Sequence, residues 1–219
     1  MKIALTGGIA CGKSTFAKFL RELGIRLLDA DDVVHELESA GGCAVPALVS
    51  RFGHAILDSV GGIDRRKLAD LVFTDVQAAQ ARADLEAILF PLVRKRLQDF
   101  VAETETTNAV APLRIAVIPL LFESHFDADY DIILSIVSPV GVQIDRMMRT
   151  RGYTRTQAEA RLAAQMPVAE KAARSHFVVV NDSTPQHLKD EAVRLVAWLK
   201  EKRENEYRGA DQHANRVVS

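Results

Sequence analysis

The sequence predicts an α/β fold, a five-stranded parallel sheet flanked by helices, and two observations support it. Five short apolar segments alternate with longer segments whose apolar residues recur at helical spacing. Each short segment is predominantly apolar, which is typical of strands buried on both faces of a parallel sheet. The 219 residues, 48% of them hydrophobic, are enough for one substantial core. In such folds ligands bind at the carboxyl ends of the strands.

The first elements follow from the opening 32 residues. A strand is expected at 3–6, an apolar run that ends at two glycines. Apolar side chains then recur at helical spacing from 15 to 23, and Gly24 follows the last of them, where helices commonly end. A second strand is expected at 25–28, closed by the acidic segment 29–32. The order is therefore strand, loop, helix, strand.

The middle of the chain differs in character. Residues 33–109 are rich in helix formers and punctuated by glycines, so a helical insertion is expected there. The remaining strands are expected at 114–118, 131–137 and 176–181. A closing helix is expected at 188–202, and the polar residues 204–219 are expected to form a disordered tail. The whole chain is interpreted as one domain.

Composition excludes several classes of function. A formal net charge of −1 gives no basic field for a nucleic acid or an anionic membrane. Cys11 and Cys43 are too few for a disulfide framework, and no apolar run has the roughly 20 residues needed to span a bilayer. We therefore expect a cytoplasmic protein with no nucleic-acid or membrane partner.

The strongest chemical signal is the motif G-x-x-x-x-G-K-[ST] at residues 7–14, between an expected strand and an expected helix. This is the P-loop of the NTPase-type α/β fold. Its glycines let backbone N–H groups face a phosphate, and the helix N-terminus adds partial positive charge. Lys13 is expected to reach the β- and γ-phosphates, Ser14 to bind Mg²⁺, and Thr15 to support both. ATP and Mg²⁺ are the expected ligands.

Carboxylates after the second strand are the acid–base candidates. Asp29 and Asp31 lie two residues apart, so both are expected to face the cleft of the P-loop. Asp31 is the first choice to accept the proton of an acceptor hydroxyl, and Asp29 is a candidate to hold a water on Mg²⁺. Asp32 is a candidate helix cap, and all three residues could instead do no more than cap and solubilise a loop.

Arginines concentrate between residues 146 and 161 of this nearly neutral chain. A mobile segment that carries them and closes over the phosphates would exclude water and neutralise charge in the transition state. We therefore expect a lid at about 143–173. For any single arginine, a solvated helix face is an equally good interpretation.

Taken together, these motifs resemble the dephospho-CoA kinase family over about residues 1–200. The P-loop with its Thr6-Gly7-Gly8-Ile9 opening, the Asp29-Ala30-Asp31 triplet and the segment Pro119-Leu120-Leu121-Phe122-Glu123 carry the resemblance. Gln143 with Arg146, Arg161 with Gln165, and Asn181 agree with it in order and spacing. The combination is much more specific than a P-loop alone.

The resemblance implies transfer of the ATP γ-phosphate to the ribose 3′-hydroxyl of dephospho-CoA, the last step of coenzyme A synthesis. It makes Lys13 and Asp31 catalytic and assigns the helical insertion to substrate binding, with Asp31, Arg66 and Glu123 as contacts. The implied ATP-binding residues are Gly8, Ala10, Cys11, Gly12, Lys13, Ser14, Thr15, Arg146 and Asn181. The implied core comprises about 1–32, 110–142 and 174–203.

Four positions depart from the family pattern. Ala10-Cys11 stands where Gly-Ser is usual, and an alanine fits position 10 without strain only if its φ is negative. Phe90 stands where the family often has histidine, and Thr150 where it has arginine, so Arg149 or Arg151 is left to replace that arginine.

Other functions share the P-loop. A different small-molecule or nucleoside kinase is the main alternative, because only the acceptor separates the two. A nucleotide-driven switch is disfavoured because N-K-x-D and L-S-G-G-Q motifs are absent from the sequence. A catalytically silent binding module is disfavoured by the presence of Asp31.

Overall fold

The computed structural model describes residues 1–74, 78–103 and 112–217, with side chains given except at 73, 74 and 207–217. The chain divides into two compact units, residues 1–27 with 105–219, and residues 28–104, and each is described by itself. This division resembles the expected separation of a core from a helical insertion, although residues 28–32 group with the insertion.

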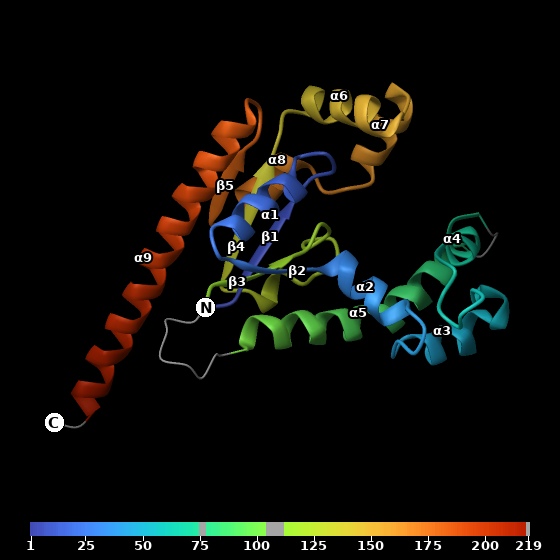
Figure 1. The fold of residues 1–219 in the computed structure, drawn as a ribbon, viewed down its shortest axis with the longest axis horizontal. Helices are drawn as coiled ribbons and strands as arrows, with labels where there is room; N and C mark the ends of the chain where they lie inside the picture. Colours follow the sequence, from blue (N-terminus) through green and yellow to red (C-terminus); the bar gives the residue numbers. More distant parts are fainter. Residues whose placement is uncertain (75–77, 104–111, 218–219) are drawn as a thin grey trace. The chain divides into compact units, whose positions relative to one another are not determined.

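The five expected strands are present in one sheet of order β2-β3-β1-β4-β5 (Figure 1). Their bounds are β1 Ile3–Gly7, β2 Arg26–Asp29, β3 Arg114–Val117, β4 Ile132–Val137 and β5 Phe177–Val180. β1 pairs in parallel with β3 and β4, with Ile3 opposite Ile115 and Ile132, and β4 pairs in parallel with β5. The central strand β1 therefore has strands on both sides, and the P-loop leaves the sheet from its carboxyl end.

The first unit also contains helices. They are α1 Lys13–Glu22, α6 Val140–Arg151, α7 Arg155–Ala163, α8 Val168–Ala173 and α9 Pro185–Val217. α1 packs against α9, and α8 packs against β4 and β1. The core between strands and helices buries Ile3 and Leu5 of β1 with Phe16, Leu20 and Leu195. Burial of this apolar face orients α1 so that its first turn follows β1 directly.

The last helix corrects one expectation. A helix was expected to end near residue 202, with a disordered tail from 204, but α9 continues to Val217. The physical reason is composition: residues 200–206 contain Lys, Glu, Arg and Asn with no proline or glycine, so nothing in that stretch terminates a helix. The expected helix end was therefore too early.

The second unit is helical, as predicted for the insertion. Its elements are α2 Ala30–Glu38, α3 Val45–Phe52, the 3₁₀ turn η1 His54–Ile56, α4 Arg65–Thr74 and α5 Ala78–Ala102. A second 3₁₀ turn, η2 Asp127–Asp129, belongs to the first unit. α5 packs against α2, α3 and α4. Glu38 is buried and pairs with Arg65 at 2.8 Å, which joins the end of α2 to the start of α4.

Candidate functional site

The P-loop begins where β1 ends and runs into the first turn of α1. Gly12 is the N-cap of α1 and has a left-handed backbone with φ 89°. An added Cβ at Gly12 would lie 2.3 Å from the Asn181 Nδ2 atom. At Gly8 it would lie 2.6 Å from Val168 Cγ1 and 2.7 Å from Gln143 Nε2. Glycine is therefore required at both positions of the loop, Gly8 and Gly12, by the neighbours that the loop touches.

Lys13 and its neighbours stand at the helix N-terminus, as the motif predicts. The Lys13 ammonium donates to the carbonyl oxygens of Gly7 at 2.6 Å and Gly8 at 3.0 Å, so it curls back over its own loop. Ser14 and Thr15 are exposed in the first turn of α1, which carries no acidic residue. The positive end of the helix dipole and the Lys13 charge therefore act together on any anion at this turn.

The backbone carbonyls of the P-loop accept hydrogen bonds from side chains that are distant in the sequence. Gln143 Nε2 donates to Ile9 O at 2.7 Å, and Arg146 donates to Ala10 O at 3.3 Å. Asn181 Nδ2 donates to Cys11 O at 2.9 Å. Three consecutive carbonyls thus have partners outside the loop, so its shape is set by tertiary contacts. The motif residues do not determine that shape alone.

Arg146 and Asn181 meet at one junction, which the sequence did not reveal. The Arg146 guanidinium donates to Ser138 Oγ at 3.0 Å, to Asn181 O at 3.2 Å and to Asn181 Oδ1 at 3.4 Å. Ser138 is buried and donates to Asn181 O at 2.6 Å. Ser138 was missed, yet its position directly after β4 was the available signal, because ligand sites gather at strand carboxyl ends.

Ala10 does not have the negative φ that an alanine needs to fit this position without strain. Its φ is 57°, in the left-handed region, whereas strain-free tolerance of an alanine required a negative φ. A left-handed backbone costs an L-residue about 1–2 kcal/mol. Ala10 and Ile9 pack against the buried cluster of Ile144, Met147 and Ala158, and this contact holds the strained turn in place.

Cys11 is buried inside the loop and lies 3.0 Å from Gln143 Nε2. Burial raises the pKa of its thiol above 9.0, although the nearby Lys13 charge acts in the opposite direction. The protonated thiol is a poor nucleophile, so the structure favours packing over redox chemistry. Gln143 Oε1 is also buried and has no hydrogen-bond partner among the described residues.

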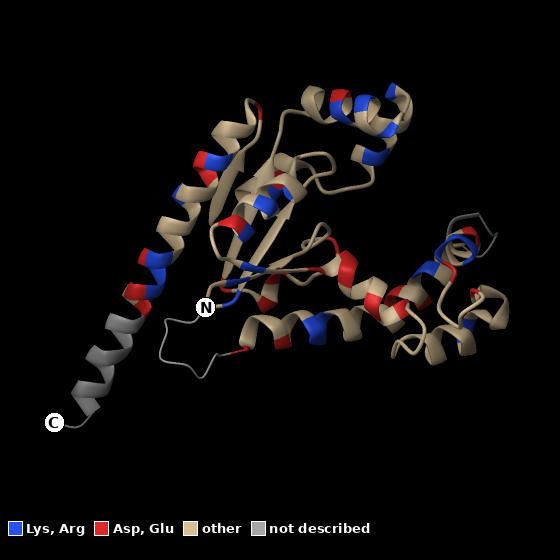
Figure 2. Ribbon diagram, in the orientation of Figure 1, with Lys and Arg blue, Asp and Glu red and all other residues tan. Residues whose placement is uncertain are grey.

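The expected lid corresponds to α6, α7 and α8, and Figure 2 shows basic residues along α6 and α7. Thr154 and Gln157 form a capping box at the start of α7. Arg149 and Arg151 are both exposed in the last turn of α6. Arg149 follows Arg146 by three residues and therefore shares its helix face, whereas Arg151 does not.

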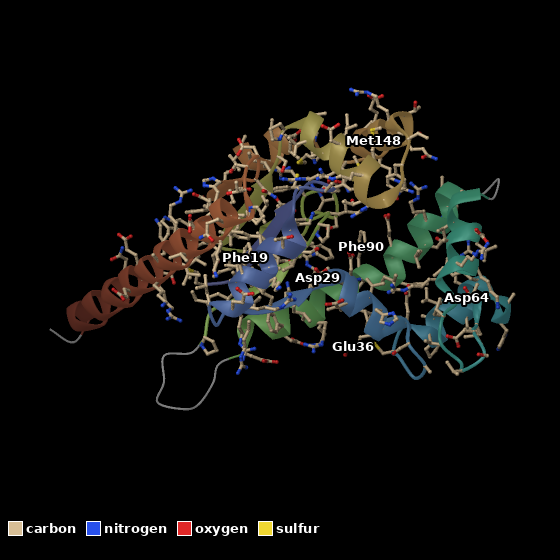
Figure 3. All side chains as sticks on the ribbon, turned by 45° about the horizontal axis from the view of Figure 1, so that its top comes forward. Phe19, Asp29, Glu36, Asp64, Phe90 and Met148 are labelled. Atoms are coloured by element: carbon tan, nitrogen blue, oxygen red, sulfur yellow. The ribbon has the colours of Figure 1, made fainter. Side chains whose placement is uncertain are left out.

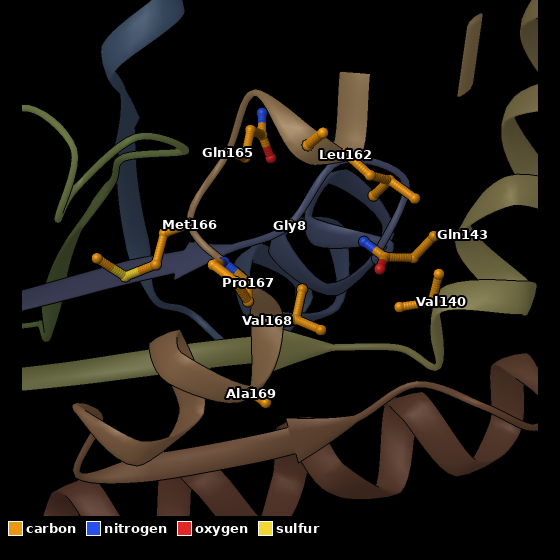
Figure 4. Close-up of a pocket in the computed structure, with 10 residues that line it drawn as sticks. Gly8, Val140, Gln143, Leu162, Gln165, Met166, Pro167, Val168 and Ala169 are labelled. Atoms are coloured by element: carbon orange, nitrogen blue, oxygen red, sulfur yellow. The ribbon is translucent and has the colours of Figure 1, made fainter. Parts of the chain in front are cut away.

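A pocket of about 340 Å³ lies between the P-loop and the segment that follows α7 (Figure 4). It is bounded by Gly8, by Val140 and Gln143 of α6, by Leu162 and Ala163 at the end of α7, and by residues 165–169. Its lining is mainly apolar, so it is poorly suited to a triphosphate. Within this segment, Val168 still lies close to Gly8, since a Cβ added to Gly8 would be 2.6 Å from Val168 Cγ1.

Glu123 has internal partners that the sequence did not predict. The ammonium of Lys171, which is fully buried, lies 2.8 Å from Glu123 Oε1 and donates to Pro119 O at 2.9 Å. Glu123 Oε1 also accepts from the Met166 N–H at 3.0 Å, and 22% of the Glu123 side chain is exposed. Lys171 carried no sequence signal, because a lysine in a short helix normally faces solvent.

The acidic candidates lie in and next to the second unit. Asp29 is the N-cap of α2, and its Oδ1 accepts from the Asp31 N–H at 2.9 Å (Figure 3 labels Asp29). The suggestion that Asp32 caps this helix is wrong, because Asp32 lies within the first turn. Asp31 and Arg66 are exposed, Arg66 in the first turn of α4 after Asp64.

Two further absences concern the described part of the chain. No group of three or more His, Cys, Asp or Glu that could hold a metal ion occurs within residues 1–74, 78–103 and 112–217. Among the described helices, none is both long enough and apolar enough to cross a membrane.

Comparison with known proteins identifies the family. The model of the dephospho-CoA kinase family matches residues 1–187. The dephospho-CoA kinase of Anaeromyxobacter dehalogenans is 41% identical, over 90% of this chain and 92% of that protein. That of Geobacillus kaustophilus is 37% identical, over 92% and 96%. The solved structure of dephospho-CoA kinase from Campylobacter jejuni is 25% identical, with a TM-score of 0.70, over 93% of this chain and 100% of that chain. The chain therefore belongs to the dephospho-CoA kinase family.

Proposed function

We propose that this protein phosphorylates the ribose 3′-hydroxyl of dephospho-CoA with ATP, producing coenzyme A and ADP. Membership of the family supports this reaction. The observation that carries the ATP half is the complete P-loop at the carboxyl end of β1, with Lys13, Ser14 and Thr15 at the N-terminus of α1. The acceptor rests on the family and is therefore the part to test first.

The phosphates are assigned to the P-loop, namely Gly8, Ala10, Cys11, Gly12, Lys13, Ser14 and Thr15. The Lys13 ammonium would leave the Gly7 and Gly8 carbonyls, its partners here, and turn to the β- and γ-phosphates. Mg²⁺ is the proposed metal, with Ser14 as a ligand and Asp29 holding a water on it. The exposed Ser14 hydroxyl and the Asp29 carboxylate are hard oxygen donors of the kind that Mg²⁺ prefers. Bound Mg²⁺ would neutralise phosphate charge.

Asp31 is the proposed general base. It accepts the proton of the 3′-hydroxyl as that oxygen forms a bond to the γ-phosphorus, and the bond from the γ-phosphorus to the β–γ bridging oxygen breaks to release ADP. Exposure of Asp31 at the start of α2 leaves its carboxylate accessible to a substrate. The neighbouring Asp29 keeps that turn in place by capping the helix.

The helical insertion, about 33–109, is the proposed substrate-binding part, with Arg66 as a contact, and Glu123 is a second proposed contact. The segment 143–173 is the proposed lid. Arg146 and Asn181 are assigned to ATP, with Asn181 beside the adenine, and their contacts with the Ala10 and Cys11 carbonyls place them at the P-loop. For the arginine usual at position 150 we propose Arg149, because it shares a helix face with Arg146.

The cytoplasm is the proposed location, because ATP is supplied there. No nucleic-acid partner is proposed, since a net charge of −1 gives no general attraction to a polyanion.

Mass spectrometry of the products, together with ADP release, tests the function. Purified protein receives ATP and Mg²⁺ with dephospho-CoA, with adenosine, with other nucleosides, or with no acceptor. Gain of one phosphoryl group by dephospho-CoA alone is the expected result. Transfer to a nucleoside would replace the acceptor and keep the kinase, and ADP release without an acceptor would indicate an NTPase.

Two variants test the roles within that assay. Asp31→Asn is expected to bind ATP normally and to lower kcat by about two orders of magnitude or more, because it removes the base. Lys13→Ala is expected to abolish turnover, because it removes charge that acts on the transition state. Normal turnover by Asp31→Asn would refute the assignment of the base.

A further inference from the structure

We propose that Glu123 and Lys171 form a clasp that positions the end of the lid segment against the P-loop, and that this clasp supports ATP binding. Neither residue needs to contact ATP for this role. The inference rests on the proposed kinase function for its kinetic readout, whereas its binding readout is independent of the acceptor.

The clasp joins three segments. The Lys171 ammonium donates to both Glu123 oxygens, at 2.8 and 3.1 Å, and to Pro119 O at 2.9 Å. Thr6 Oγ1 donates to the same Pro119 oxygen at 3.2 Å. Because Thr6 is the last residue before the P-loop motif, the ion pair is connected to the loop through a single shared carbonyl.

The other end of the clasp sets the lid segment. Glu123 Oε1 accepts from the Met166 N–H at 3.0 Å. The preceding residue, Gln165, accepts from the Ile9 N–H of the P-loop at 3.1 Å. The hydrogen bond at Met166 therefore also positions the backbone of Gln165, and this position determines whether the Gln165 side chain can bond to the Ile9 N–H.

Packing alone fixes this segment only in part. Val168 lies close to Gly8, but Leu162, Ala163 and residues 165–169 also line the 340 Å³ pocket. Where a cavity replaces packed atoms, dispersion contacts that would define the spacing are lost. The polar contacts of Gln165, Glu123 and Lys171 therefore help to set the distance between this segment and the loop.

The stability of the fold does not explain why charged residues occupy positions 123 and 171. Lys171 is fully buried, and a buried ion pair can often be replaced by apolar residues of similar volume with no loss of stability. What an apolar pair cannot do is accept the Met166 N–H or hold the Pro119 carbonyl. The charges therefore specify geometry, which is the property that a binding loop needs.

The decisive variant is the double substitution Glu123→Leu with Lys171→Met. It removes both charges and all the hydrogen bonds of the clasp without leaving an unpaired ion. Urea unfolding checks the fold, and titration with a fluorescent ATP analogue, without any acceptor, measures nucleotide affinity. KM and kcat are then measured separately for ATP and for dephospho-CoA.

The double variant is expected to unfold cooperatively with stability close to that of the wild type. Its Kd for the nucleotide is expected to rise about tenfold, which corresponds to the loss of about one hydrogen bond that orients the loop. The matched control is Asp127→Asn, which breaks the neighbouring ion pair of Arg174 and Asp127 at 2.8 Å. Asp127 does not touch the lid segment or the P-loop in any described contact, so the control is expected to keep wild-type affinity.

A folded double variant with wild-type nucleotide affinity and kinetics would overturn the proposal, because the pair would then serve only the fold. Unchanged nucleotide affinity with a raised KM for dephospho-CoA would also overturn it, and would make Glu123 a substrate contact. If the double variant does not fold, the nucleotide affinity of the single variant Glu123→Asp provides the test. This variant keeps the charge opposite Lys171 but shortens the reach to Met166, so wild-type affinity in that variant would overturn the clasp. Failure of the wild type to phosphorylate dephospho-CoA would instead refute the proposed function and leave the nucleotide titration valid.

Discussion

Gly12→Ala is expected to destabilise the protein mainly through Asn181. The new Cβ would lie 2.3 Å from Asn181 Nδ2, so the amide must move away and release the Cys11 carbonyl that it holds at 2.9 Å. A buried carbonyl left without a partner costs about 1–3 kcal/mol. The backbone adds a second penalty, since φ at Gly12 is 89°.

Gly24 separates these two contributions. Its φ is 82°, close to that of Gly12, but an added Cβ would meet nothing within 4 Å. Gly24→Ala is therefore expected to cost only the left-handed backbone penalty, reduced because alanine lowers the conformational entropy of the unfolded chain, about 0.5–1 kcal/mol. Gly12→Ala is expected to cost about 2–4 kcal/mol, the same backbone penalty plus the lost Asn181 contact.

The assay is urea unfolding followed by the fluorescence of Trp198, the single tryptophan, which packs on Phe177 at 5.2 Å. Asn181→Ala provides the second arm of a double-mutant cycle. In that background the clash and the hydrogen bond are already gone, so Gly12→Ala is expected to cost no more than Gly24→Ala does. The expected coupling is about 1–3 kcal/mol. Equal costs of Gly12→Ala in both backgrounds would refute the reasoning.

Three further results are expected. Ala10→Gly should change the free energy of unfolding by less than about 1 kcal/mol, because relief of the left-handed backbone is offset by unfolded-chain entropy and a lost methyl contact; a larger loss in urea unfolding would contradict this. Iodoacetamide followed by peptide mass mapping should label exposed Cys43 and spare buried Cys11 until the protein is unfolded. Stability should also fall above pH 9.0, the ordinary thiol pKa, because the raised pKa keeps Cys11 protonated in the folded state while the unfolded thiol ionises. Urea unfolding across that pH range should show a smaller fall for Cys11→Ser, and an identical fall would exclude Cys11 as its source.

Local patterns predicted much of the fold. The five strands, α1 and the helical second unit agree with the sequence-based expectations, because continuous apolar runs, helical spacing and glycine punctuation are properties of neighbouring residues. The P-loop is similarly local, since its chemistry depends on eight consecutive residues and the strand and helix beside them. The expected end of the last helix was wrong, and α9 continues beyond it because no helix breaker follows residue 202 directly.

The contacts that shape the loop were decided by tertiary structure. Asn181 reaches Cys11 across 170 residues, and Gln143 reaches Ile9 across 134. No local pattern encodes such pairs, because they depend on which strands lie beside β1 and on how α6 and the end of β5 reach the loop.

What the sequence by itself determined is therefore the α/β class, the nucleotide-binding motif and the resemblance to the dephospho-CoA kinase family. Only the tertiary structure decided the left-handed backbone of Ala10, the burial of Lys171 beside Glu123, and the use of Asp29 as a cap. The physical reason is range: periodicity and turn chemistry act between neighbours in the chain, whereas burial and the pairing of polar groups depend on the packing of segments that are distant in sequence.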